Sequence, residues 1–138
     1  MSGSIEVIAG GMFCGKTEEL LRRVRRECLA RRCVQLFKHS IDDRYSVDSV
    51  CTHDAIKLPC LSAKTADEIR RQILPTTQVV AIDEVQFFDE NIVMLASDLA
   101  DDGYRVILAG LDMDFKRMPF GPMPTLLSIA DDVSKIRA

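Results

Sequence analysis

The sequence lacks the charge excess and the long apolar runs that two large classes of protein require. Its 138 residues include 18 Lys and Arg against 21 Asp and Glu, so there is no global basic excess of the kind that nucleic-acid-binding proteins carry. No stretch approaches the roughly 18 apolar residues of a membrane span. The amino-terminal segment MSGSIEVIAGG has no Lys or Arg where a secretory signal would place them. The sequence therefore predicts a soluble, cytoplasmic protein with neither a membrane nor a nucleic-acid partner.

Paired cysteines are also missing. The five cysteines form an odd set without a C-x-x-C pair, and the only histidines are His39 and His53. Neither a disulfide framework nor a zinc site with four ligands is indicated by this pattern. We expect reduced thiols and no zinc site in this chain.

What the sequence does contain is the apolar content of one compact core. Its hydrophobic fraction is 47%, and short apolar runs alternate along the chain with helical patterns. We predict strands at residues 5–9, 34–37, 79–82, 105–109 and 133–137, and helices from residue 16, at 65–74, around 92–99 and at 126–130. Residues 39–54 are polar and are predicted to form turns. This alternation predicts an α/β fold in a single domain, residues 1–138, with a mostly parallel sheet flanked by helices.

A glycine-rich segment joins the first predicted strand to the first predicted helix. Its residues, which fit the phosphate-loop pattern G-x-x-x-x-G-K-[ST], are Gly10, Gly11, Met12, Phe13, Cys14, Gly15, Lys16 and Thr17. Glycines let successive backbone N–H groups point at phosphate oxygens, and Lys16 supplies a positive charge. The hydroxyl of Thr17 is placed to ligate the magnesium ion of a nucleoside triphosphate. The pattern predicts a P-loop, RecA-like core that binds ATP with magnesium.

Two acidic residues follow the buried strand at residues 79–82. Asp83 stands at the carboxyl end of that strand, the edge where ligands bind in parallel sheets, and is the expected second partner of magnesium. Glu84 is a candidate general base, placed to take a proton from an attacking hydroxyl or water. The alternative for Glu84 is a surface carboxylate at the mouth of the strand.

Basic residues are concentrated on the first predicted helix and just beyond it. They are Arg22, Arg23, Arg25, Arg26, Arg31 and Arg32. Nucleic acid is a conceivable partner of this group. We favour the alternative, a solvated helix face whose arginines pair with Glu18, Glu19 and Glu27 on neighbouring turns.

Several segments taken together resemble the thymidine kinases found in the cytosol of animals and in many bacteria. These segments are GGMFCGKTEELLRRVRR, FKHSIDDRYS, CTHD, VVAIDEVQFF and AGLDMDFKRMPFGPMP, in the family's order and spacing. The resemblance implies transfer of the ATP γ-phosphoryl group to the 5′-hydroxyl of thymidine, which gives dTMP for nucleotide salvage and DNA synthesis. It implies Glu84 as the base on that hydroxyl, with Lys16 and Arg44 as the catalytic cations.

The resemblance also assigns residues to the two substrates. Outside the phosphate loop, the residues implied to line the ATP site are Asp42, Asp43, Arg44, Asp83, Glu84, Val85 and Gln86. The residues implied to form an apolar slot for the thymine base are Met12, Phe87, Leu111, Phe115 and Phe120. Flat rings stack on a base and close packing selects it. Phe88 has no such role by analogy and is predicted to pack in the core.

The resemblance ends where family members continue into a zinc ribbon and a loop that closes over the nucleoside. We expect neither in this chain. An alternative function is therefore a catalytically weak fragment or a non-catalytic module that binds ATP and magnesium. A further alternative, a P-loop ATPase acting on nucleic acid through the Arg-rich helix, is disfavoured by the acidic total. Family members form homo-oligomers, commonly tetramers, and the resemblance implies the same assembly here.

Overall fold

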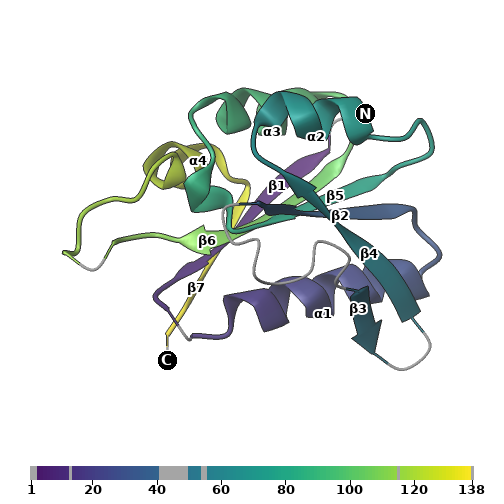
Figure 1. Cartoon of the computed structure of the whole chain (residues 1–138), viewed down its shortest axis with the longest axis horizontal. Coiled ribbons are helices and arrows are strands. Elements are labelled where there is room, and N and C mark those ends of the chain that lie inside the picture. The colour runs from purple at the N-terminus through teal and green to yellow at the C-terminus, as the bar shows by residue number, and fades with distance from the viewer. Residues whose placement is uncertain (1–2, 13, 41–49, 54–55, 115, 138) are drawn as a thin grey trace.

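The computed structural model describes residues 3–12, 14–40, 50–53, 56–114 and 116–137. Within these residues a seven-stranded sheet forms the centre, in the order β3-β4-β2-β5-β6-β1-β7 (Figure 1). The strands are β1 (Ser4–Gly10), β2 (Val34–His39), β3 (Val50–His53), β4 (Ile56–Ala63), β5 (Val79–Asp83), β6 (Arg105–Leu111) and β7 (Asp132–Ile136). All neighbouring pairs are parallel except β3 with β4. The predicted α/β fold with a mostly parallel sheet is confirmed.

Helices cover both faces of this sheet (Figure 1). They are α1 (Lys16–Leu29), α2 (Ala66–Gln72), α3 (Asn91–Asp101) and α4 (Met123–Ile129), with a short 3₁₀ helix η1 (Val85–Phe87) after β5. Helix α1 packs Leu20 and Val24 against Ile8 of β1. On the other face, Leu95 of α3 packs in a core that contains Val7 of the same strand. Neighbouring residues of β1 thus serve opposite faces, as the alternation of side chains along a strand requires.

The central strands follow from their apolar runs. All five residues of β5, VVAID, are buried, which is the pattern of a parallel strand covered on both faces. Strand β1 is equally buried after its first residue, although it contains Glu6. Helix α2 begins after Thr65, whose side chain accepts a hydrogen bond of 3.1 Å from the backbone N–H of Glu68. None of the helices in the described ranges is long and apolar enough to cross a membrane.

One part of the predicted secondary structure is wrong. Residues 39–54 were expected to form turns, but β3 (Val50–His53) lies within them, and β4 (Ile56–Ala63) was not predicted. The first half of β4 pairs with β3 up to Pro59, and the second half pairs with β2 from Cys60 onward. A proline inside an apolar run argues locally against a strand. Here Pro59 lies where β4 changes partners, which only the assembled sheet reveals.

Candidate functional site

The glycine-rich loop after β1 lies at the carboxyl edge of the sheet, where parallel strands place ligands. Gly15 precedes α1 with a φ of 90°, a left-handed conformation that glycine adopts without strain. A Cβ atom on Gly10 would lie 2.4 Å from the carbonyl oxygen of Ile136 and 2.6 Å from Sγ of Cys14. Gly11 has nothing within 4 Å of such an atom and is exposed. Two of these glycines are therefore required by the loop, and the third leaves its backbone open to a ligand.

Lys16 is the first residue of α1 and is only 8% exposed. Its Nζ donates a hydrogen bond of 2.8 Å to the carbonyl oxygen of Gly11 and contacts Sγ of Cys14 at 3.9 Å. The ammonium group therefore turns back over the loop whose N–H groups would surround a phosphate. A phosphate oxygen is a stronger partner for an ammonium than a neutral carbonyl is, so the lysine is held close to its expected task.

Thr17, at the start of α1, meets Asp83 of β5, although the loop that precedes α1 follows β1, which is not a neighbour of β5. Strand β6 lies between β1 and β5, which puts those two strands about 10 Å apart. The loop arches over the end of β6, and α1 then packs against both β6 and β5. As a result, Oγ1 of Thr17 donates a hydrogen bond of 3.0 Å to Oδ2 of Asp83. The two residues predicted to serve a magnesium ion are brought together.

The carboxyl group of Asp83 is buried, and this burial raises its pKa above the ordinary range because desolvation disfavours the charged form. The backbone N–H of Glu84, the hydroxyl of Thr17 and the positive charges of Lys38 and Lys16 act in the opposite direction. Lys38 was not predicted as part of the site. It stands opposite Asp83 in the register of β2 with β5, so a lysine ending an apolar strand was the signal that could have identified it.

Glu84 has a left-handed backbone, with φ of 56° and ψ of 37°, which is unusual for a residue other than glycine. Its backbone N–H donates a hydrogen bond of 2.9 Å to Oδ1 of Asp83. Such strain is typical of active sites, where the surrounding structure holds a side chain in a required direction. Glu84 lines the same pocket as Lys16 and Thr17.

That pocket has a volume of about 690 Å³ and combines two kinds of wall. One wall is polar and consists of residues 14–17 together with Glu84 and Gln86. The other is apolar and contains Met12, Phe87 and Leu111. A polar wall for phosphates beside an apolar wall for a flat ring is the arrangement expected of a nucleotide or nucleoside site.

Aromatic rings continue this apolar wall. The rings of Phe87 and Phe120 meet edge to face with centroids 5.6 Å apart. Phe120 lines an adjoining hollow of about 580 Å³ together with Met12 and Leu111. Phe88 is 3% exposed and packs in the core, as predicted, with the ring of His39 at 4.6 Å. Burial lowers the pKa of His39, which favours its neutral form.

The remaining predicted site residues divide into two groups. Phe13, Asp42, Asp43, Arg44 and Phe115 lie outside the described residues. Val85 is fully buried in the core beside β6, and Gly10 lines the adjoining hollow with Phe120. Of the predicted set that is described, the structure thus brings the loop, Asp83, Glu84, Gln86 and the apolar wall to one edge of the sheet.

Some of the arginines of α1 and of the residues after it are paired with acidic side chains. Arg22 and Arg23 both bond Glu19, and Arg32 pairs with Glu27 at 3.1 Å. The predicted pairing with neighbouring glutamates is confirmed for these arginines. Cys14, Cys28, Cys33 and Cys60 take part in no disulfide bond within the described residues.

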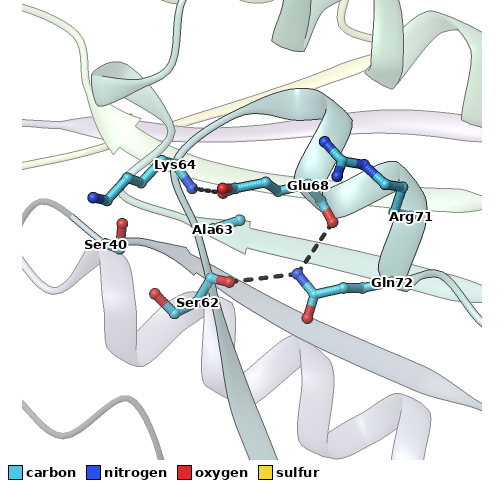
Figure 2. A pocket seen from close by; sticks show the side chains of 7 residues that line it. All are labelled: Ser40, Ser62, Ala63, Lys64, Glu68, Arg71 and Gln72. Carbon is cyan, nitrogen blue, oxygen red and sulfur yellow. Dashed lines mark hydrogen bonds between the residues drawn. The ribbon is translucent and has the colours of Figure 1, made fainter.

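A separate pocket of about 550 Å³ lies at the ends of β2 and β4 (Figure 2). Some of its polar groups bond one another. Glu68 accepts a hydrogen bond from the backbone N–H of Lys64, and Gln72 donates to the carbonyl oxygens of Ser62 and Glu68 (Figure 2). This pocket contains none of the predicted site residues.

Comparisons with known proteins agree with this geometry. A solved structure, the flagellar accessory protein FlaH from Methanocaldococcus jannaschii, is similar with a TM-score of 0.67, at 11% sequence identity, over 97% of this chain and 71% of that one. This likeness concerns the fold alone. A thymidine kinase of Porphyromonas gingivalis is 54% identical over 138 residues, which are 99% of this chain and 66% of that protein.

The family model described as thymidine kinase matches residues 3–138, nearly the whole sequence. The chain spans slightly less than two thirds of the length of the thymidine kinase from Porphyromonas gingivalis. The match covers the glycine-rich loop, Asp83, Glu84 and the apolar wall alike. On these grounds the chain belongs to the thymidine kinase family.

Proposed function

We propose that this chain is one nucleotide-binding domain that transfers the γ-phosphoryl group of ATP to the 5′-hydroxyl of thymidine, which gives dTMP. The observation that carries the proposal is the single pocket onto which Lys16, Thr17, Glu84 and the apolar residues all open. Membership of the thymidine kinase family supports the choice of both substrates.

The phosphates of ATP bind over the glycine-rich loop. Backbone N–H groups of the loop and the amino terminus of α1 favour negative charge, and Lys16 leaves the carbonyl of Gly11 to bond phosphate oxygens. Arg44, assigned by resemblance, adds positive charge near the group being transferred. Fixed positive charges at that place stabilise the charge that develops in the transition state.

Thr17 and Asp83 fit a magnesium ion. Their oxygens converge at 3.0 Å, and both are the hard donors that magnesium prefers. No cluster of three or more His, Cys, Asp or Glu side chains that could hold a metal occurs in the described ranges, which suits an ion bound partly by phosphates. When bound, magnesium would neutralise phosphate charge during transfer. Asp83 holds its position through the N–H of Glu84.

Glu84 acts as the general base. Its carboxylate takes the proton of the 5′-hydroxyl as that oxygen forms a bond to the γ-phosphorus, while the bond from the γ-phosphorus to the bridging oxygen breaks. ADP leaves with the electron pair of the broken bond. The strained backbone of Glu84 supports this role because it holds the carboxylate toward the pocket that contains the loop.

The base of thymidine lies against the apolar wall. Met12, Phe87 and Leu111 offer contact area in the main pocket, and Phe120 extends it into the adjoining hollow. Phe115 is assigned to the same slot by resemblance. An apolar site next to the phosphate loop places the 5′-end of the nucleoside toward Glu84 and excludes water from the reacting oxygen.

A cytoplasmic location and assembly into a homo-oligomer, a tetramer by resemblance, go with this proposal. The odd set of five cysteines without a C-x-x-C pair supports a reducing compartment. Family membership supports the oligomer. Sedimentation of the purified protein would measure its assembly state directly.

The deciding experiment compares the wild-type chain with Glu84→Gln in a thymidine phosphorylation assay with ATP and magnesium. Loss of a general base typically lowers kcat by about 10² to 10⁴. ATP affinity should stay within about twofold, since the glutamine keeps the shape of the side chain. Glu90→Gln, at an exposed position before α3, is the matched control and should leave both quantities unchanged.

Each outcome has a distinct meaning. Full turnover by Glu84→Gln would refute the assignment of the base. A wild-type chain that binds ATP but phosphorylates no thymidine would refute the kinase and leave the alternative, a module that only binds ATP and magnesium. Thymidine binding measured by calorimetry, without ATP, shows whether the nucleoside site is formed in that case.

A further inference from the structure

Gln86 is a buried glutamine whose amide is only half used. It is 2% exposed, and its Oε1 accepts a hydrogen bond of 3.1 Å from the backbone N–H of Leu111. Because this bond fixes the oxygen, it also fixes the orientation of the amide. The Nε2 group is buried and has no hydrogen-bond partner in the part of the chain that the structure describes. A buried donor left in this state is unfavourable, because its lost contact with water is not replaced by another hydrogen bond.

Two other glutamines show what a purely structural role looks like in this fold. Nε2 of Gln35 donates to the carbonyl oxygen of Gln72 at 3.0 Å, and its Oε1 accepts from Leu74 and Thr77. Nε2 of Gln72 bonds two carbonyl oxygens (Figure 2). Gln35 uses both its donor and its acceptor, and Gln72 uses its donor. The unused donor of Gln86 therefore indicates a partner that comes from outside the protein.

The pocket supplies the space for such a partner. Gln86 lines the hollow of about 690 Å³ beside Glu84 and Phe87. A Cβ atom on Gly110 would lie 2.8 Å from Oε1 of Gln86, so the amide reaches the end of β6 on the side of Gly110. Gly110 lies on the same face of β6 as Val106 and Leu108, because alternate residues of a strand share a face. This is the face that packs against α3 and α4.

The phosphate loop lies on the other side of the sheet. Lys16 and Thr17 begin α1, which packs on the opposite face, against residues such as Ile107. The amide of Gln86 thus enters the pocket from the face opposite the phosphates and next to the aromatic wall. A neutral amide also suits an uncharged oxygen, whereas the phosphate has a lysine and the loop N–H groups.

We propose that Nε2 of Gln86 donates a hydrogen bond to an uncharged oxygen of the nucleoside, either a carbonyl of the base or a sugar hydroxyl. Gln86 is then a specificity-determining residue for the phosphoryl acceptor. The inference rests on the proposed function and deepens it. A site with a buried donor discriminates strongly against an acceptor substrate that lacks the matching oxygen, because the donor is left unpaired.

The first test measures steady-state kinetics of Gln86→Met and Gln86→Glu with the full chain. Methionine keeps the length of the side chain and removes the donor, while glutamate keeps an oxygen for the N–H of Leu111. Both variants should raise KM for thymidine at least about tenfold and leave KM for ATP within about twofold. Gln35→Met is the matched control, since it removes a buried amide remote from the pocket and should change neither KM.

The second test identifies the oxygen. Wild type and Gln86→Met are assayed with thymidine, 3′-deoxythymidine, and thymidine analogues that lack the 2- or the 4-carbonyl oxygen. One of these analogues should bind wild type more weakly than thymidine does, because it lacks the oxygen that Gln86 contacts. With Gln86→Met this difference between the analogue and thymidine should largely disappear, because the hydrogen bond is already absent. Equal losses in both proteins for every analogue would overturn the inference.

The results separate this inference from the proposed function. If wild type phosphorylates thymidine and Gln86→Met leaves KM for thymidine unchanged, the kinase stands and the role of Gln86 is refuted. A rise in KM for ATP alone would also refute it, because the amide would then serve the phosphoryl donor. If wild type neither binds nor phosphorylates thymidine, both proposals fail together.

Discussion

The two ends of the central sheet treat buried polar groups differently. Toward the amino ends of the strands, Glu6 is 9% exposed, and its carboxylate accepts hydrogen bonds from Arg23 at 3.0 Å and from Arg105 at 2.8 Å. Arg105 also bonds Glu27. At the carboxyl ends, Asp83 carries a raised pKa, and Nε2 of Gln86 has no hydrogen-bond partner among the described residues. Ion pairing of buried charges is typical of a scaffold, and a buried donor without a hydrogen bond at the edge of a pocket is typical of a site that awaits ligands.

The largest expected effect comes from removing the cation at the carboxyl end. Lys16→Ala should weaken ATP binding about 100-fold, since a charge-assisted bond to phosphate is worth up to about 3 kcal/mol, and should abolish most turnover. Isothermal calorimetry with ATP and magnesium measures the affinity. Arg22→Ala removes a cation from the same helix that pairs on the surface with Glu19, and it should bind ATP as wild type does. Equal affinities for Lys16→Ala and wild type would remove the lysine from the site.

A substitution at the amino ends of the strands should change the free energy of unfolding and not the affinity for ATP. Glu6→Gln removes the charge that two arginines share, and breaking a buried pair in this way costs about 3–5 kcal/mol. Because the side chain of Arg105 is 34% exposed, solvent screening reduces the expected loss to about 2 kcal/mol. Urea unfolding gives this quantity. Asp98→Asn, in an exposed pair with Arg70, should change it by less than about 1 kcal/mol.

A loss of ATP affinity in Glu6→Gln as large as the loss in Lys16→Ala would break the comparison. The paired end would then belong to the site. We expect ATP affinity within about twofold of wild type, because Glu6 lies away from the residues that line the pocket.

The smallest expected effect is a gain in stability and not a loss. Burial raises the pKa of Asp83 above its ordinary value of 3.8, so the folded protein binds more protons than the unfolded chain between these two values. The stability of wild type therefore falls as pH rises through that interval. Asp83→Asn removes the charge and can still accept from the N–H of Glu84. Its melting temperature at pH 7 should exceed that of wild type by a few degrees.

Thermal unfolding between pH 3 and pH 8 checks this sign. The gain of Asp83→Asn should shrink as pH falls toward the ordinary pKa of the carboxyl group, where wild type is protonated as well. A gain that does not depend on pH would show that packing and not charge is responsible. Asp98→Asn serves again as the control, with no comparable change expected at this exposed position.

The sequence predicted those parts of the fold that depend on local patterns. Strands β5 and β6 contain continuous apolar runs, and β1 is apolar from Ile5 to Ala9 except for Glu6. The glycine-rich loop has a fixed spacing that places Lys16 at the start of α1. Strand β3 was missed because its only partner is β4, and a short edge strand takes its conformation from that distant pairing. Strand β4 was missed as well, because a proline such as Pro59 argues locally against a strand.

The candidate site was predicted in its residues but not in its geometry. That Asp83 follows a buried strand can be read from the sequence, whereas its hydrogen bond with Thr17 depends on α1 crossing beneath β6 and β5. The left-handed backbone of Glu84 leaves no trace in residue type, since glutamate rarely adopts it. The unused donor of Gln86 appears only once every neighbour has been placed.

The backbone of Glu84 has a consequence for directed evolution. Glycine adopts φ of 56° without strain, so Glu84→Gly relieves that strain while it deletes the proposed base. Asp83→Asn is also expected to stabilise the protein, because it removes a buried charge. A library screened for heat resistance alone would therefore enrich inactive proteins with changes at these two adjacent codons, and any thermostability programme for this chain needs a selection for turnover in every round.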